Sequence, residues 1–220
     1  MMSKQGKPQK GDKQPATVSL EILVEEESAA EALRPVVAKI LDGKRVRIGF
    51  RKFRGKPDLI KNLPDRLKGY ATARRRGEDV RIVVLVDRDN DDHADLKDQL
   101  DKIAITAGLI PHTEQQPGVF NVLSGIAVRE LESWYFGDWP AVRAGFPKAP
   151  AEPPRSHKGN PDQTSGKCSD AFEKMLLSSG VRIASKPEWG RRIGPHLALD
   201  GNRSPSFSAF ISGVQAITAE

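Results

Sequence analysis

Cysteine, long apolar runs and the motifs of several enzyme classes are scarce or absent in this sequence of 220 residues. The single cysteine, Cys168, cannot form a disulfide within the chain, which suits a reducing compartment. No stretch approaches the ~18 consecutive apolar residues that a membrane span needs, and the lysine-bearing start of the chain has no apolar signal segment. We therefore expect a cytoplasmic protein that has no membrane partner.

Zinc-site spacing, the nucleophile elbow of serine hydrolases and the Walker A motif of ATPases are missing as well. The four histidines are scattered and, with one cysteine, they do not have the spacing of a zinc site. The sequence contains no serine in a nucleophile-elbow motif and no Walker A motif.

The composition is that of an ordinary globular chain. Hydrophobic residues make up 38% and charged residues 29%, which is enough apolar material to bury a core. The chain carries 35 basic and 29 acidic residues, and the net charge of +6 allows a nucleic-acid partner. Residues 1–17 contain four lysines and are expected to be a disordered basic tail.

Apolar periodicity predicts alternating strands and helices through the first part of the chain. Strands are expected at residues 18–24, 46–53, 80–86 and 119–123, with helices at 29–41, 59–76 and 94–107. Ser28 and Asp58 are predicted to cap the first two helices, and Gly77 to follow the second. The pattern indicates an α/β fold with an open, mostly parallel sheet and helices on both faces.

The rest of the chain is predicted to be an appendage of the same unit. Residues 18–146 are expected to form the α/β domain. Residues 147–169 contain five prolines and are expected to form a loop. Residues 170–220 are expected to form a C-terminal α-rich appendage that packs on the same domain.

Acidic residues follow two of the predicted strands, at the edge of the sheet where ligands collect in open α/β folds. Glu25, Glu26 and Glu27 follow the first strand, and Asp87 and Asp89 follow the third. Carboxylates that converge in this way repel one another, and a hard divalent cation such as Mg²⁺ supplies the missing counter-charge. The sequence therefore indicates a cation site at this edge.

A third acidic element is the segment Arg129-Glu130-Leu131-Glu132-Ser133-Trp134. On a helix, Glu130 and Glu132 point about 200° apart, so only one of them can face the site. Which glutamate faces inward depends on the phase of the helix, which the sequence leaves open. Leu131 and Trp134 are predicted to be core residues.

These blocks resemble known families. An apolar strand ending in Val24-Glu25 and another ending in Asp87-x-Asp89 resemble the two signatures of the Toprim domain, which occurs in primases, topoisomerases and nucleases of the overcoming-lysogenization-defect type. The chain is more closely similar to the family known as domain of unknown function 4276. The matching blocks lie at residues 23–33, 53–59, 86–92, 129–138 and 202–207.

The resemblance implies a Toprim-like fold with a metal centre of Glu25, Asp87 and Asp89. It also implies a partnership with a separate ATPase in bacterial anti-phage defence. Toprim proteins usually have glycine after the first glutamate, where this chain has Glu26. The second acid of that motif would fall near Ala29, where this chain has none.

The first functional hypothesis is a Mg²⁺- or Mn²⁺-dependent nuclease that hydrolyses phosphodiester bonds of DNA or RNA. Glu25 would be a general base or a ligand, Asp87 and Asp89 would be ligands, and Glu130 or Glu132 would be a further ligand or orienting group. Lys56 would contact a phosphate. The residues expected to contact the nucleic-acid backbone are Arg51, Lys52, Arg54, Lys56, Arg74, Arg75 and Arg76.

Two other functions fit the same pattern. The departures at Glu26 and Ala29 are compatible with a catalytically degenerate subunit that regulates a partner or binds nucleic acid. A strand followed by D-x-D is also the nucleophile signature of haloacid-dehalogenase-type phosphotransfer enzymes, in which Asp87 would take the phosphoryl group. Against this last hypothesis, the motif follows the third strand. Assembly into a homo-oligomer is compatible with every one of these functions.

Overall fold

A sheet of four parallel strands organises the computed structural model, which describes residues 18–113, 119–183 and 185–219. The strands are β1 (Val18–Val24), β2 (Val46–Lys52), β3 (Val80–Asp87) and β4 (Val122–Ala127), in the order β2-β1-β3-β4. The two central strands are almost entirely buried, as expected where helices cover both faces. The predicted α/β class with a parallel sheet is confirmed. The tail predicted for residues 1–17 lies outside the described residues.

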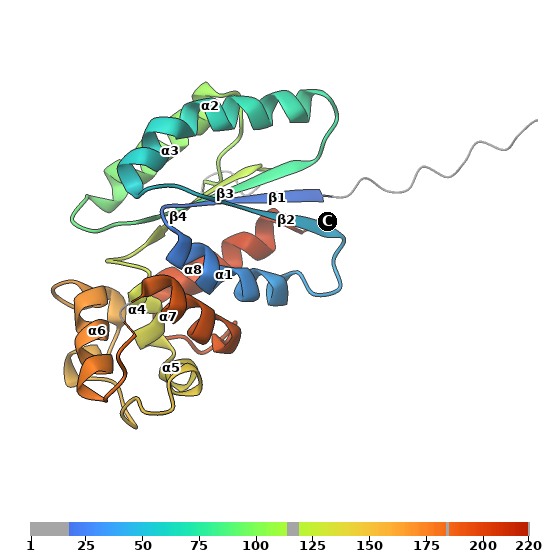
Figure 1. The fold of residues 1–220 in the computed structure, drawn as a ribbon. Coiled ribbons are helices and arrows are strands. Elements are labelled where there is room, and N and C mark those ends of the chain that lie inside the picture. Colours follow the sequence, from blue (N-terminus) through green and yellow to red (C-terminus); the bar gives the residue numbers. More distant parts are fainter. Residues whose placement is uncertain (1–17, 114–118, 184, 220) are drawn as a thin grey trace, which may run out of the picture.

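Helices cover both faces of the sheet (Figure 1). One face carries α2 (Lys56–Arg75) and α3 (His93–Thr106), and the other carries α1 (Glu27–Ile40) and α8 (Pro205–Ile217). Leu59, Leu63 and Leu67 recur every four residues along α2, so they lie on one side of the helix and are fully buried. α1, α2 and α3 each connect one parallel strand to the next, which brings the carboxyl ends of all four strands to one edge.

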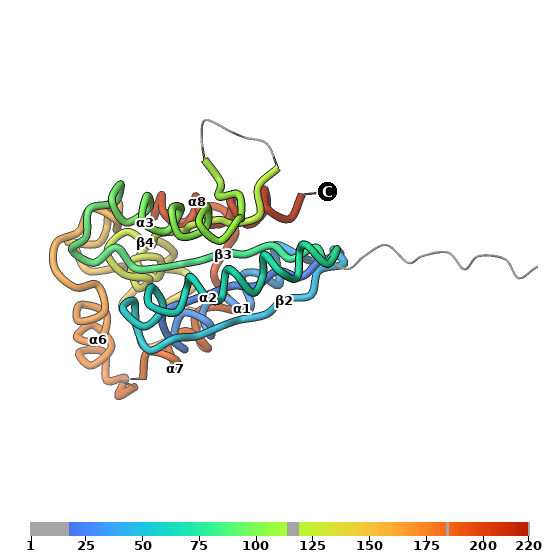
Figure 2. Tube along the Cα trace, turned by 90° about the horizontal axis from the view of Figure 1, so that it is seen from above, coloured from blue at the N-terminus to red at the C-terminus, as the bar shows by residue number. Residues whose placement is uncertain are grey.

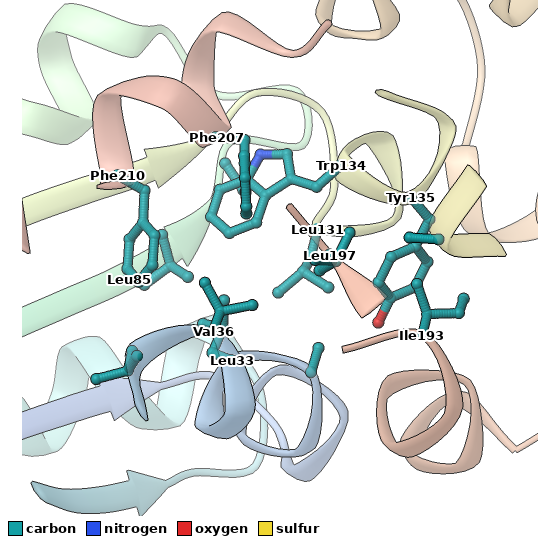
Figure 3. Close-up of a cluster of buried hydrophobic side chains, with 14 of the residues drawn as sticks. Leu33, Val36, Leu85, Leu131, Trp134, Tyr135, Ile193, Leu197, Phe207 and Phe210 are labelled. Atoms are coloured by element: carbon teal, nitrogen blue, oxygen red, sulfur yellow. The ribbon is translucent and has the colours of Figure 1, made fainter. Parts of the chain in front are cut away.

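The segment between β4 and α8 shares the core of the sheet. It contains α4 (Glu132–Gly137), α5 (Trp139–Gly145), α6 (Cys168–Ser178), α7 (Lys186–Ile193) and three short 3₁₀ turns at 155–157, 161–163 and 194–196. Figure 3 shows Trp134 of α4 beside Phe207 and Phe210 of α8, above Leu33 and Val36 of α1. Leu131 and Trp134 are core residues, as predicted. No helix among the described residues is long and apolar enough to cross a membrane.

Several predicted boundaries are wrong. The first helix begins at Glu27 with Glu26 as its N-cap, and Ser28 Oγ donates to the Glu26 carboxylate at 3.5 Å instead of capping. The second begins at Lys56, directly after Gly55, whose φ of 90° favours glycine. Asp58 therefore lies in the first turn of α2 and accepts a hydrogen bond from the Arg54 N–H.

The last strand and the proline-rich segment also differ from expectation. β4 spans Val122–Ala127, not residues 119–123, because its ladder with β3 runs on through Gly125 to Ala127. Gly125 interrupts the apolar pattern, which is why the sequence predicted an earlier end. Residues 147–169 contain two of the 3₁₀ turns, and α6 starts at Cys168, inside the predicted loop.

The close approach of α7 to the backbone of α1 gives a stability prediction. A Cβ atom on Gly190 would lie 2.7 Å from the Ser28 carbonyl oxygen and 2.8 Å from the Ala32 nitrogen, and backbone cannot yield easily. We expect Gly190→Ala to cost roughly 1–3 kcal/mol of unfolding free energy, which lowers Tm by about 3–10 °C. Gly69→Ala is the control, because a Cβ there meets nothing within 4 Å. Thermal unfolding followed by circular dichroism measures this loss. A Gly190→Ala variant as stable as wild type would contradict the close packing of α7 against α1.

Candidate functional site

Acidic side chains from three neighbouring strands meet at the carboxyl edge of the sheet. Glu25 follows β1, Asp87 ends β3, and Glu132 begins α4 shortly after β4. These three line a cavity of about 40 Å³. The charge of Asp89, two residues beyond β3, contributes to raising the pKa of Glu25 and of Asp87. We call Glu25, Asp87, Asp89 and Glu132 the acidic centre.

Glu25 ties the end of β1 to the end of β3. Its Oε1 accepts a hydrogen bond from the Asp87 N–H at 2.8 Å. Burial raises the pKa of Glu25 to about 7, although that hydrogen bond and the charge of Lys56 act in the opposite direction. The Glu25 carboxyl group therefore changes its charge near neutral pH, which is the range that suits a group that transfers protons.

Asp87 and Glu132 face the same cavity from β3 and α4. Asp87 Oδ1 accepts a hydrogen bond from the Leu131 N–H at 3.0 Å. Burial raises the pKa of Asp87 well above its ordinary value, and the charges of Glu132 and Glu25 raise it further. Burial also raises the pKa of Glu132, against the effect of the nearby Lys186. These carboxyl groups cannot all be ionised unless a cation balances their charge. Without one, at least one of them keeps its proton.

Lys56 holds the loop that follows β3. Its Nζ lies 2.8 Å from Asp89 Oδ2 and 2.8 Å from Asp91 Oδ2, and it donates to the Asp87 carbonyl oxygen at 2.8 Å. Asp89 has a φ of 52°, an uncommon left-handed conformation that this loop imposes. Lys56 is thus engaged with carboxylates at the position where the sequence predicts a phosphate contact.

The structure distinguishes the two glutamates of the third element. They do not share a helix: α4 begins at Glu132, and Arg129 has a φ of 71° just before Glu130. The Glu130 carboxylate accepts hydrogen bonds from the N–H and Oγ of Ser169, both at 2.9 Å, and so anchors the start of α6. Glu132 is the glutamate that lines the cavity with Asp87. The expectation that both lie on one helix is wrong, because the chain turns between them.

Lys186 is a site residue that the sequence did not reveal. It is the first residue of α7 and lines the same cavity, with its Nζ 3.4 Å from Glu132 Oε1. Burial alone would lower the pKa of Lys186, but the charges of Glu132 and Glu130 raise it. No local motif marks this lysine, because only the packing of α7 against α1 brings it to the sheet edge.

The basic residues predicted to contact nucleic acid fall into two groups. Arg51 pairs with Glu21 at 2.8 Å and Lys52 with Glu27 at 2.9 Å, at the end of β2. Arg54 lies just beyond them and is exposed. Arg74, Arg75 and Arg76 lie at the other end of α2, whose 20 residues span about 30 Å. This second group is therefore at the opposite edge of the sheet from the acidic centre.

The donor atoms of the acidic centre are suited to a hard cation. Among the described residues, no three His, Cys, Asp or Glu side chains already stand together as a metal-binding group. Glu25 and Asp87 each accept a backbone N–H through one oxygen, and the described residues give their second oxygens no hydrogen bond. Mg²⁺ and Mn²⁺ prefer carboxylate oxygens as ligands. A bound cation would also relieve the repulsion between these carboxylates.

The segment 202–207 supports the site from outside. Asn202 Nδ2 donates to the carbonyl oxygen of Trp134 in α4 at 3.0 Å. Ser204 Oγ and the Ser206 N–H both donate to the Asp162 carboxylate, at 2.7 and 2.8 Å. These bonds fix α4 to α8, so the segment has a structural role. The partners of these bonds could not be identified from the sequence alone.

Comparison with known proteins identifies the family of this chain. No curated protein and no solved structure is significantly similar to this chain. A family model described as "Domain of unknown function (DUF4276)" matches residues 24–215. The match begins just before Glu25 and includes the whole acidic centre as well as the segment 202–207. Because it covers most of the chain, the protein belongs to the DUF4276 family.

Proposed function

We propose that this protein is a Mg²⁺- or Mn²⁺-dependent nuclease that hydrolyses phosphodiester bonds, with a centre of Toprim type. The observation that carries the proposal is the acidic centre itself. Its carboxylates come from adjacent strand ends, and burial raises the pKa of Glu25, Asp87 and Glu132. Lys56 and Lys186 neutralise Asp89 and Glu132 only in part, and a cation that binds Glu25 and Asp87 would relieve the remaining repulsion, which is why we assign one to this centre.

Each side chain has a role in this proposal. Glu25, Asp87 and Asp89 would hold the cation, which supplies charge stabilisation at the phosphate and activates water. Glu25 is suited to accept a proton at neutral pH, because its pKa lies near 7. Glu132 orients Lys186, and that ammonium group lies where it can contact a phosphate oxygen at the cavity. Lys56 acts as the residue that positions Asp89.

The proposal is tested by cleavage of plasmid DNA and of RNA with Mn²⁺. We expect Glu25→Gln and Asp87→Asn each to lower the cleavage rate by about 10²–10⁴-fold, the usual cost of losing a group that acts in proton transfer or charge stabilisation. Asp42→Asn is the matched control, because this aspartate is exposed beyond α1 and far from the centre. Cleavage by both variants at the wild-type rate, or cleavage that persists in EDTA, would refute the assignment.

We also propose, from the family resemblance, that the nuclease works with a separate ATPase subunit in anti-phage defence, in the cytoplasm. The sequence has no Walker A motif of its own. The cleavage assay is therefore run on the chain alone and on the complex that it forms when co-expressed with its genomic neighbours. Activity that appears only in the complex, and is lost with Asp87→Asn in this chain, assigns the chemistry to the acidic centre.

A second candidate is a degenerate subunit that binds nucleic acid without cleaving it. One observation favours it: Lys56 already neutralises Asp89 and Asp91 in the described structure. A lysine bound in this way could replace a cation. Unchanged unfolding temperatures with and without Mn²⁺ would favour this candidate. A phosphotransfer role for Asp87 has no comparable support, because Glu25 and Glu132 would repel a phosphoryl group there.

A further inference from the structure

Positive charge is concentrated in one segment of the chain. Residues 44–76, which form β2, α2 and their flanks, contain thirteen Lys and Arg residues and two Asp residues. The net charge of this segment is therefore +11, whereas the whole chain carries only +6. The rest of the molecule, including the acidic centre, is net acidic. Such segregation creates a positive field on one side of the protein.

The fold spreads this charge along one margin of the sheet. β2 is an edge strand that pairs only with β1 among the described strands. α2 packs against α3 and β3, and Figure 2 shows β2 running beside α2. Arg47 and Arg51 point to the α2 side, because Arg47 donates to Ser19 Oγ at 2.9 Å and Arg51 pairs with Glu21. Tyr70 of α2 donates to the same Glu21 carboxylate.

We call six of the exposed cations of this margin the basic shelf. Its members are Arg47, Arg51, Arg54, Lys61, Arg66 and Arg76. Within the described part of the chain, only Arg51 of these six takes part in an ion pair. The other five charges are not neutralised by a described carboxylate and are free to meet a ligand. The shelf follows α2 for about 30 Å, and the Lys56 end of that helix touches the acidic centre.

We propose that the basic shelf binds the backbone of a double-stranded nucleic acid and leads it to the acidic centre. This inference rests on the proposed function, because it names the form of the substrate. A length of about 30 Å is close to one turn of a duplex, at 3.4 Å per base pair. Arginine and lysine side chains along that length match the phosphates of such a backbone and carry no information on sequence.

The aromatic residues of the region favour a duplex over a single strand. Proteins that bind single strands stack the bases on exposed rings. Here the Tyr70 hydroxyl donates to Glu21, and Phe53 packs against the core beneath α2. Phe50 lies on the other side of β2, under the guanidinium of Arg34. The described part of the shelf therefore presents charge without a stacking surface, which suits a paired backbone.

The test is a binding measurement that involves no cleavage. Fluorescence anisotropy in EDTA compares a labelled duplex of about 20 base pairs with its single strand, over about 50–200 mM salt. We expect wild type to bind the duplex more tightly. The variant Arg47→Gln/Arg66→Gln/Arg76→Gln is expected to bind it at least about 10-fold more weakly, and the slope of log Kd against log salt should fall by about 2–3. DNA and RNA duplexes are run in parallel to identify which one binds.

The control variant is Arg143→Gln/Lys148→Gln/Arg182→Gln. It loses the same net charge from exposed positions in the C-terminal helices and their loops, so it should bind within about 2-fold of wild type. Equal weakening in both triple variants would mean that net charge alone drives binding, and it overturns the shelf. Tighter binding of the single strand, or no binding of any nucleic acid by wild type, also overturns it.

Cleavage by the shelf variant separates this inference from the proposed function. If duplex binding depends on the shelf but neither the chain alone nor its co-expressed complex cleaves with Mn²⁺, the nuclease assignment fails and the shelf remains. If the shelf variant cleaves a duplex at low concentration as fast as wild type does, the shelf fails and the nuclease assignment remains.

Discussion

Raising the pH from about 5 to about 8 in EDTA is expected to destabilise this protein, whereas most proteins gain or keep stability over that range. The cause is the acidic centre. Burial raises the pKa of Glu25 from 4.5 to about 7, so the folded protein keeps a proton that the unfolded chain has lost. The native state binds more protons between these two values, and its free energy of unfolding therefore falls as the pH rises through them.

The expected loss from Glu25 is about 1–3 kcal/mol, allowing for its partial contact with solvent. The pKa values of Asp87 and Glu132 are raised in the same direction by burial, so these groups add to the loss. Below about pH 4.5 both states hold the Glu25 proton, and above about pH 7 both have lost it, so the slope due to Glu25 is confined to that window.

Mn²⁺ is expected to reverse this effect, because a cation binds the ionised carboxylates and competes with protons. At ~100 times its dissociation constant it adds ~2.7 kcal/mol, or roughly 5–10 °C in Tm for a chain of this size. The stabilisation should be larger at pH 8 than at pH 5. Thermal and urea unfolding at each pH, with EDTA or Mn²⁺, measures both trends.

Asp87→Asn separates the two contributions. The amide keeps an oxygen that can accept the Leu131 N–H but carries no charge. We expect this variant to be more stable than wild type at pH 8 in EDTA, to have a flatter pH profile, and to gain little from Mn²⁺. Asp42→Asn should behave as wild type does. A wild-type stability that rises between pH 5 and pH 8 in EDTA would contradict the burial of these carboxyl groups.

Local patterns in the sequence were sufficient to predict the frame of this site. The strand at 18–24 is recognisable from its alternating apolar residues and the strand at 80–86 from its continuously apolar centre, and the acids that follow them must then lie at one edge. The fold therefore brings Glu25 and Asp87 to one cavity, with Asp89 two residues beyond the end of β3, for reasons that are visible in short windows of sequence. The same windows predicted the helices between the strands, with errors of a few residues at their ends.

Residues whose position depends on distant packing could not be predicted in this way. Lys186 reaches the cavity only because Gly190 allows α7 to lie against the backbone of α1. Glu130 lies outside α4, after Arg129 with its positive φ, and is held by the two hydrogen-bond donors of Ser169. No local apolar pattern and no short motif contains this information, since the partners come from other parts of the chain.

Asp162 is the distant residue with the largest expected effect on stability. It lies in the 3₁₀ turn at 161–163, and its carboxylate accepts from Ser204 Oγ at 2.7 Å, the Ser206 N–H at 2.8 Å and Ser133 Oγ at 3.3 Å. Asp162→Ala leaves these donors without their acceptor. Hydrogen bonds to charged groups contribute about 1.5–3 kcal/mol each and are not additive, so we expect a loss of about 3–5 kcal/mol and a fall in Tm of roughly 6–15 °C.

The same substitution should weaken the acidic centre, because Ser133 directly follows Glu132 in α4. Once the Asp162 contact is lost, α4 is less firmly held against α8, and Glu132 is less firmly held beside Asp87 and Lys186. Both the stability of the protein and its additional stabilisation by Mn²⁺ should therefore fall in Asp162→Ala. Asp42→Ala should change neither. Asp162→Asn keeps one acceptor oxygen and should lose less than half as much. Equal stability of Asp162→Ala and wild type would show that α4 is held by its apolar contacts alone.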